Sequence, residues 1–163
     1  MALQKLTVTA LFIAIGVFSA HIIYIPLGIA KCFPVQHAIN VLLSVFLGTR
    51  YSLSAAFGIS VLRNLAGTGS LLAFPGSMFG AALSGIVYRK TGSMAGAIAG
   101  EIIGTGLLGG LFAVPVAKYI LGVEAGALFF VVPFMVSTVG GSMLAYFIYL
   151  TPITAFFKAK FPL

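Results

Sequence analysis

The sequence predicts an all-α, polytopic membrane protein: a bundle of six transmembrane helices. Three observations lead to this fold class. Of the 163 residues, 61% are hydrophobic and only 7% are charged, whereas about a quarter of a typical globular domain is charged. The mean hydropathy is +1.19. The chain also divides into six apolar stretches, and because a transmembrane helix needs roughly 20 residues, these leave no room for a large soluble domain.

The six spans are predicted at residues 6–25, 35–48, 51–65, 71–88, 94–120 and 127–150, within one integral membrane domain that covers residues 1–163. The first span is predicted to be a retained helix rather than a cleaved signal. A cleavage site after Ala20 would need a small residue at the minus-three position, where the chain has Phe18. Pro26 ends this helix.

Turn and charge signals separate the remaining spans. Arg50 follows the second, a Gly-Thr-Gly loop at 67–69 closes the third, Arg89 and Lys90 stop the fourth, and Pro115 interrupts the fifth. The second and third spans have about 15 residues each, or roughly 22 Å of helix. A re-entrant hairpin is the alternative for this pair, but it would leave Arg50 at mid-bilayer at high cost. Two thin spans are therefore favoured.

The basic residues predict the orientation. With the N-terminus inside, six lie on the cytoplasmic side, namely Lys5, Arg50, Arg89, Lys90, Lys158 and Lys160, and three lie outside, namely Lys31, Arg63 and Lys118. Cytoplasmic loops are enriched in Lys and Arg, so both termini are predicted to be inside. The same rule accounts for the net charge of +7, and the chain has no basic run typical of nucleic-acid binding.

Neither a metal site nor a cofactor is expected. The chain has one cysteine, Cys32, and two histidines, His21 and His37, and no Cys/His spacing typical of zinc ligands. It also lacks the Gly-Lys-Ser/Thr ending of a phosphate-binding loop. Any energy from ATP must therefore come from another chain.

Polar residues within the spans gather in the outer half of the predicted bundle. Polar groups in a membrane are costly and are functional candidates by default. The candidate substrate-binding residues are Gln36, His37, Asn40, Arg63, Asn64, Thr68, Phe74, Glu101, Thr105 and Ser137. Phe74 is one of several outer-half aromatics, with Phe33, Phe112, Phe129, Phe130 and Phe134, that are candidates to sandwich a flat ring. This asymmetry predicts a pocket that is open to the exterior.

Glu101 is the most informative of these residues, because a carboxylate at mid-bilayer needs a partner. An ion pair with Arg63 and a hydrogen bond to Asn40 or His37 are the structural alternatives to a ligand contact. Thr105 is predicted one turn further out on the same helix face.

Two other classes of function are weighed against a binding protein. A small membrane enzyme would use Glu101 and His37 as acid and base, but no catalytic motif or paired carboxylate supports catalysis. A homo-oligomeric channel would need a polar stripe through the full thickness of the membrane, which the sequence lacks.

Several blocks resemble the substrate-binding S components of energy-coupling factor (ECF) transporters, specifically the ThiW type. The blocks are residues 31–40 (KCFPVQHAIN), 62–64 (LRN), 67–69 (GTG), 72–78 (LAFPGSM), 100–101 (GE) and 104–106 (GTG). The resemblance implies a six-helix protein of the prokaryotic plasma membrane that captures a thiamine precursor outside the cell. Hydroxyethylthiazole is the precursor most associated with this type, with the hydroxymethylpyrimidine precursor and thiamine itself as alternatives.

The resemblance also implies partners: a membrane-embedded T component and two ABC-type ATPases. In S components an Ala-x-x-x-Ala motif on the first helix contacts the T component, and Ala10 and Ala14 match it. Internal helix packing is the alternative for this pair. It is the favoured interpretation for the glycine faces of the fourth and fifth spans, which include Gly80, Gly100 and Gly104.

Overall fold

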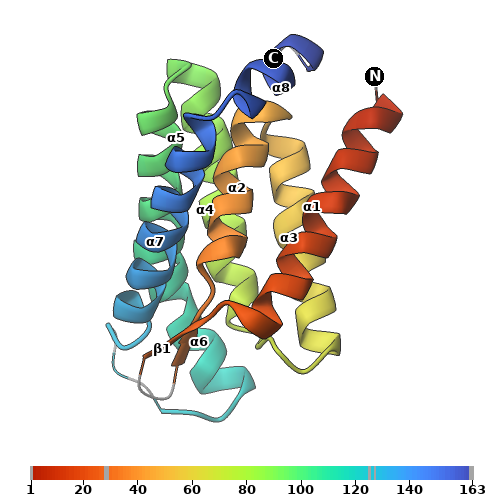
Figure 1. The fold of residues 1–163 in the computed structure, drawn as a ribbon. Coiled ribbons are helices and arrows are strands. Elements are labelled where there is room, and N and C mark those ends of the chain that lie inside the picture. The colour runs from red at the N-terminus through yellow and green to blue at the C-terminus, as the bar shows by residue number, and fades with distance from the viewer. Residues whose placement is uncertain (1, 28–29, 125, 127, 162–163) are drawn as a thin grey trace.

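The computed structural model describes residues 2–27, 30–124, 126 and 128–161, and in these ranges it is an all-α bundle of seven helices with one short β-ribbon. The helices are α1 (Ala2–Ile22), α2 (Pro34–Phe46), α3 (Thr49–Leu65), α4 (Ala73–Thr91), the continuous rod of α5 (Met94–Glu101), η1 (Ile102–Gly109) and α6 (Gly110–Ile120), α7 (Val131–Tyr149) and α8 (Ile153–Lys160). Successive long helices run in opposite directions along the bundle (Figure 1).

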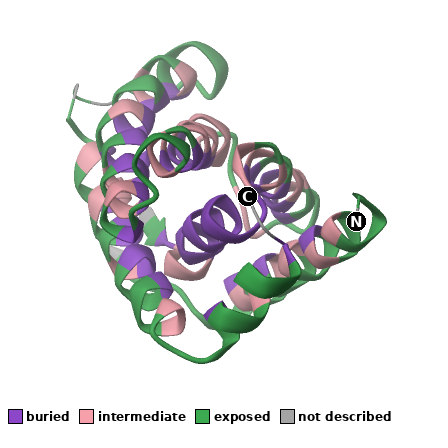
Figure 2. Ribbon diagram, turned by 90° about the horizontal axis from the view of Figure 1, so that it is seen from above, coloured by how far each residue is buried: buried purple, intermediate pink, exposed green. Residues whose placement is uncertain are grey.

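Helix α2 is the centre of the bundle. Every residue from Gln36 to Leu47 is buried, and α2 contacts α1, α3, α4, α5, α7 and α8. It is the mostly purple helix that the others surround in Figure 2. Its 13 residues make roughly 20 Å of helix. Because other helices rather than lipid enclose it, α2 does not need the length of a lipid-facing span.

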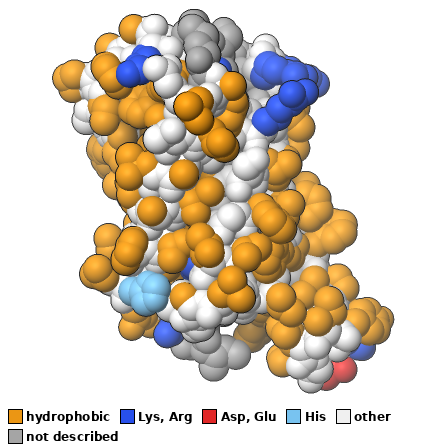
Figure 3. All heavy atoms as spheres, turned by 90° about the vertical axis from the view of Figure 1, so that its right-hand side faces the viewer, with side chains coloured by type: hydrophobic (Ala, Val, Ile, Leu, Met, Phe, Trp, Pro, Cys, Tyr) orange, Lys and Arg blue, Asp and Glu red, His pale blue; other side chains and the backbone are white. Residues whose placement is uncertain are grey.

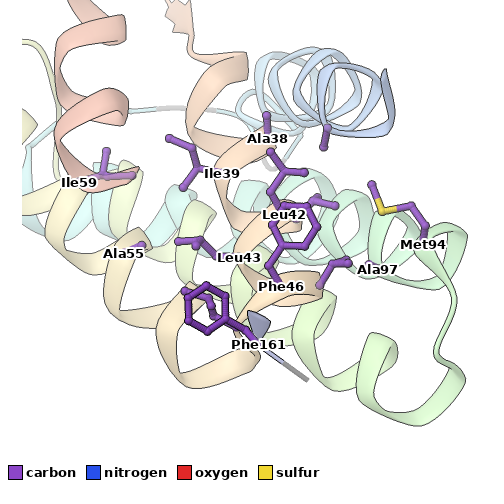
Figure 4. Packing of buried hydrophobic residues seen from close by; sticks show 14 residues of the cluster. Ala38, Ile39, Leu42, Leu43, Phe46, Ala55, Ile59, Met94, Ala97 and Phe161 are labelled. Atoms are coloured by element: carbon purple, nitrogen blue, oxygen red, sulfur yellow. The ribbon is translucent and has the colours of Figure 1, made fainter. Parts of the chain in front are cut away.

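The apolar core is built on the half of α2 that is farther from the ribbon. Leu42, Leu43 and Phe46 are each at most 2% exposed and pack with Ile59 of α3 and with α5 (Figure 4). The ring of Phe46 also stacks on Phe157 of α8, with centroids 4.7 Å apart. Three of the four polar residues of α2, Gln36, His37 and Asn40, are by contrast in its first two turns, toward the ribbon, and only Ser44 lies farther along.

The two ends of the bundle differ. The N-terminus and α8 lie at one end, and the antiparallel ribbon of β1 (Ile25–Leu27) and β2 (Ala30–Cys32) lies at the other (Figure 1). Between the two ends, the face seen in Figure 3 is largely covered by hydrophobic side chains, with Lys and Arg mainly near the ends. Such a surface suits contact with lipid.

Several predicted boundaries are wrong. Helix α1 covers residues 2–22 instead of 6–25, because residues 25–27 pair with β2 in a ribbon that the sequence did not predict. Helix α4 covers residues 73–91 instead of 71–88 and continues past Arg89 and Lys90 to Gly92, whose φ of 64° ends it.

Two further differences concern the C-terminal part. Helix α7 begins at Val131, whereas the span was predicted from residue 127, which lies outside the described residues. The tail, predicted without structure, forms α8. Among the described helices, three are long and apolar enough to cross a membrane: Ala2–Ile22, Met94–Ile120 and Val131–Tyr149. The count of six spans and their orientation stay predictions.

Glycines bring α4 against the α5–η1 rod. A Cβ on Gly100 would be 2.7 Å from the backbone oxygen of Leu83, and one on Gly104 would be 2.5 Å from that of Phe79. These glycine faces therefore serve internal packing, as predicted. The rod is π-helical from Ile102 to Gly109, a conformation that is rare and frequent at functional sites. It begins directly after Glu101.

Candidate functional site

A cavity of about 380 Å³ lies at the ribbon end of the bundle. Its wall comes from the first turns of α2, α4 and α7, the last turn of α3, β2, η1 and the adjoining loops. Six of the ten candidate binding residues line it: Gln36, His37, Arg63, Thr68, Thr105 and Ser137. The volume falls in the range of about 300–1,000 Å³ that is typical of small-molecule sites.

Glu101 lies behind the cavity wall and is fully buried. Its Oε1 accepts three hydrogen bonds, from His37 Nδ1 at 2.9 Å, Asn40 Nδ2 at 3.1 Å and Thr105 Oγ1 at 2.9 Å. Its Oε2 has no hydrogen-bond partner among the described residues. Of the alternatives for Glu101, the structure therefore has the hydrogen bonds to Asn40 and His37. The alternative that Glu101 forms an ion pair with Arg63 is wrong.

His37 connects Glu101 to the cavity. A carboxylate oxygen has no hydrogen to donate, so Nδ1 of His37 carries the proton that the two groups share. His37 also lines the cavity, and its Nε2 makes no hydrogen bond within the described part of the chain. The pair thus holds one imidazole nitrogen in place from behind and leaves the other without a hydrogen bond to the described residues.

Arg63 ties together three neighbouring segments of the cavity wall. Its Nη1 donates to Gln36 Oε1 of α2, and its Nη2 donates to the backbone oxygen of Thr68 at 3.0 Å. The ring of Phe33 lies 3.6 Å from the guanidinium carbon. Arg63 is 2% exposed, so this charge is held inside the protein rather than in solvent.

The ribbon is attached to α7 at the cavity. The backbone N–H of Phe33 donates to Ser137 Oγ at 2.8 Å, and the thiol of Cys32 donates to the backbone oxygen of Pro133 at 3.2 Å. Cys32 is 1% exposed, and burial raises the pKa of its thiol. The segment before α2 is therefore fixed to the first turns of α7.

Four aromatic side chains line the cavity, namely Phe33, Phe129, Phe130 and Phe134. Phe74 and Phe112 do not, although both were predicted in the outer half. Phe74 packs on Phe57 with ring centroids 5.8 Å apart, and Phe112 packs on Phe79. The expectation that Phe74 stacks on a ligand therefore has no support from its position.

Asn64 and Asn40 have supporting positions rather than places in the cavity wall. Asn64 Nδ2 donates to the backbone oxygens of Ser60 and Ser70, which fixes the loop after α3. Asn40 is fully buried beside Glu101 and also donates to the backbone oxygen of Ser77 at 3.2 Å.

Ser60 and Ser77 belong to the same polar network and were not among the predicted residues. Their hydroxyls are 3.1 Å apart, and Gln36 Nε2 donates to Ser60 Oγ at 3.3 Å. One signal was available for Ser60, which precedes Asn64 by four residues and so shares its helix face. Ser77 has no polar residue four positions before or after it in α4, so that signal was missing.

No group of three or more potential metal ligands occurs among the described residues. The cavity instead combines aromatic walls with a few fixed polar groups, an arrangement that suits recognition of a small organic molecule.

Comparison with known proteins identifies the family of this chain. No curated protein and no solved structure matches the chain. A family model described as "Thiamine-precursor transporter protein (ThiW)" matches residues 6–153, which include every helix that contributes to the cavity. The chain therefore belongs to the ThiW family of thiamine-precursor transporters, which are S components of ECF transporters and not enzymes.

Proposed function

We propose that this protein is the substrate-capture subunit of an ECF-type importer and that its cavity binds hydroxyethylthiazole. The observation that carries this proposal is the His37–Glu101 pair behind an aromatic-walled cavity. A neutral five-membered heterocycle with a ring nitrogen and a hydroxyl group fits such a surface, because aromatic side chains can cover the ring faces while polar groups bind its edge.

His37 is the residue proposed to contact the edge of the ring. With its Nδ1 proton held by Glu101, a neutral His37 accepts a hydrogen bond at Nε2 from the ligand hydroxyl, and a protonated His37 donates one to the ring nitrogen. Glu101 acts through His37 as a positioning residue. Gln36, Thr68, Thr105 and Ser137 add polar groups to the same cavity.

The membrane arrangement proposed is six spans with both termini in the cytoplasm. Figure 1 supports it through the alternating helix directions and through the position of both chain ends on the side away from the ribbon. The cavity then faces the exterior, where a solute arrives. The cell membrane is the corresponding location.

The T component and two ABC-type ATPases are the proposed partners. Ala10 and Ala14 are both exposed, whereas the small residues of α1 that pack inside are Gly16 and Ala20. This difference supports a partner contact over internal packing for the alanine pair. The chain itself contains no nucleotide-binding motif.

Ligand-dependent thermal stabilisation of the purified protein tests the capture function. Hydroxyethylthiazole, hydroxymethylpyrimidine and thiamine are compared, and hydroxyethylthiazole is expected to raise the unfolding temperature most. Glu101→Gln should remove most of that shift. The matched control is Ser84→Ala, because Ser84 is equally buried and its hydroxyl has no partner among the described residues. Absence of stabilisation by all three compounds would overturn the proposal.

A further inference from the structure

Ser137 presents an unused hydrogen-bond donor to the cavity. Its Oγ accepts the backbone N–H of Phe33 at 2.8 Å, and none of the described residues accepts its hydroxyl hydrogen. Ser137 lines the cavity and is only 4% exposed. A buried donor without an acceptor is unfavourable. The bond from Phe33 therefore fixes the oxygen of this hydroxyl while its hydrogen stays available.

The other buried hydroxyls of the cavity wall already use their hydrogens. Thr105 donates to Glu101 Oε1 at 2.9 Å or to a backbone oxygen of α4 at 3.1 Å. Ser77 donates to the backbone oxygen of the residue one turn earlier in α4, at 2.9 Å. Of the buried hydroxyls in the described part of the wall, only that of Ser137 is therefore free to donate to a ligand.

Ser137 and His37 lie one helix turn apart on helices that pack together. Phe33, which bonds to Ser137, precedes His37 by four residues. Gly141, four residues after Ser137, lies so close to α2 that a Cβ on it would be 2.7 Å from His37 Cβ. Helices α2 and α7 thus run in the same direction here, and His37 is roughly 6 Å deeper in the bundle than Ser137. The cavity has a donor at one level and, at Nε2 of a neutral His37, an acceptor one turn deeper.

The aromatic side chains of the wall lie at the level of Ser137. Phe33 is bonded to it through the backbone, and Phe134 precedes it by three residues and so shares its helix face. A Cβ on Gly76 would be 2.8 Å from the Phe134 ring, so the missing side chain of this glycine leaves the space that the ring occupies. A flat ligand ring is therefore best covered beside Ser137 rather than beside His37.

From this we propose that Ser137 Oγ donates a hydrogen bond to the ring nitrogen of the ligand, so that the cavity selects heterocycles whose ring nitrogen has a free lone pair. The ligand hydroxyl then donates to Nε2 of a neutral His37, one turn deeper. Hydroxyethylthiazole has this pattern, with one acceptor in the ring and a hydroxyl separated from it by four carbon atoms. A thiazolium, whose ring nitrogen is alkylated, has no lone pair for the Ser137 hydrogen and is disfavoured. This inference rests on the proposed function and names a specificity-determining residue for it.

Other groups compete for these roles. A protonated His37 can donate from Nε2 to the ring nitrogen, and Gln36 Nε2, which donates to Ser60 Oγ at 3.3 Å, has a second hydrogen. Ser137 would then be structural and only attach Phe33 to α7. A structural Ser137 predicts that removal of its hydroxyl weakens every ligand by the same factor. A Ser137 that binds the ring nitrogen predicts a loss confined to ligands that have this nitrogen.

Equilibrium binding to the purified full chain in detergent tests the inference. The ligands are hydroxyethylthiazole, its thiophene analogue, in which a C–H group replaces the ring nitrogen, and the N-methyl thiazolium. The thiazole should bind about 10-fold more tightly than the thiophene, because a ring without the nitrogen leaves the buried donor unsatisfied. Burial alone would favour the thiophene, since a C–H group is less polar than a ring nitrogen. The thiazolium should bind no more tightly than the thiophene.

Variants at two adjacent positions of α7 separate the donor from the attachment of Phe33. Ser137→Ala should make the affinities for the thiazole and the thiophene nearly equal, and Ser137→Thr, which keeps the hydroxyl, should retain the preference. Thr138→Val is the matched control that should leave the preference unchanged, because Thr138 is fully buried outside the cavity wall and its hydroxyl has no partner among the described residues. The comparison of the three ligands on the unaltered chain tests the inference even where Ser137→Ala does not fold.

Equal binding of the thiazole and the thiophene, or of the thiazole and the thiazolium, by the unaltered chain would overturn the inference and leave the proposed function intact. A preference for the thiazole that survives in Ser137→Ala would also overturn it, because another residue would then bind the ring nitrogen. Failure of all three compounds to bind would overturn the proposed function as well.

Discussion

Gly80 of α4 lies directly against the carboxylate of Glu101. A Cβ atom on Gly80 would be 2.6 Å from Glu101 Oε2 and would also collide with Thr105 Oγ1. The space that holds the buried carboxylate and its hydroxyl donor is therefore the space that a side chain on α4 would fill. The sequence pattern assigns Gly80 to helix packing. In the structure its missing side chain also leaves the space that the polar network occupies.

The first prediction is that Gly80→Ala displaces Glu101 and Thr105. The extra methyl group should destabilise the protein by about 1–3 kcal/mol, as overpacking usually does, and should abolish the thermal shift given by the ligand. Gly126→Ala is the control, because a Cβ there meets no atom of the described residues within 4 Å. Unfolding temperatures with and without ligand measure both effects, and a full ligand shift in Gly80→Ala would contradict the prediction.

The second prediction concerns coupling between His37 and Glu101. Removing one member of a buried hydrogen-bonded pair leaves the other unsatisfied, so His37→Ala and Glu101→Gln should each destabilise the chain while the double variant costs less than their sum. An interaction energy of about 1–3 kcal/mol is expected from a double-mutant cycle. Unfolding measurements on the four proteins give this value, and strict additivity would show that the 2.9 Å contact contributes no coupling.

The level of these residues along the bundle axis could be predicted from sequence, but their position around the bundle could not. Counting residues from Lys90 puts Glu101 near mid-bilayer, and the spacing to Thr105 puts both on one helix face, which the 2.9 Å hydrogen bond confirms. The same counting puts Phe74 level with the cavity. In the structure Phe74 packs on Phe57 instead, because rotation about a helix axis depends on tertiary packing.

The central place of α2 explains why the predicted partners of Glu101 were only partly right. In a helix with other helices on every side, each polar residue finds a neighbour, and His37 and Asn40 face the α5–η1 rod. Arg63 is on α3 and bonds to Gln36, in the turn of α2 nearer the ribbon. The sequence contains no signal that α2 rather than another span is central. The ribbon was also missed, since Pro26 is equally compatible with a loop.

The third prediction concerns the thiol of Cys32. It is buried, donates to Pro133 and has a raised pKa, so little thiolate is present at neutral pH. Alkylation by a maleimide should be slow at pH 7, should accelerate as the pH rises toward the raised pKa, and should become fast when heating separates the ribbon from α7. Labelling followed by mass spectrometry measures the rate.

An exposed thiol supplies the reference for that rate. In a Cys32→Ala chain, Ser93→Cys places a cysteine at an exposed position between α4 and α5, outside the predicted spans, where labelling should be rapid at pH 7. Ligand should slow the labelling of Cys32 further, because Lys31 and Phe33 on either side line the cavity, and should leave position 93 unaffected. Equal rates at the two positions would contradict the burial of Cys32.

The fourth prediction tests the role of α1 separately from ligand binding. Ala10 and Ala14 are exposed, so Ala10→Leu with Ala14→Leu should leave the unfolding temperature and ligand affinity of the isolated chain nearly unchanged, since exposed substitutions usually cost less than about 0.5 kcal/mol. A close helix contact depends on small residues, so co-purification with the T component and ATPases should fall sharply. Ala95→Leu, at an exposed alanine of α5, is the control that should leave co-purification intact. A double variant that binds ligand and still assembles normally would remove the alanine pair from the partner interface, and one that no longer binds ligand would show that α1 supports the cavity.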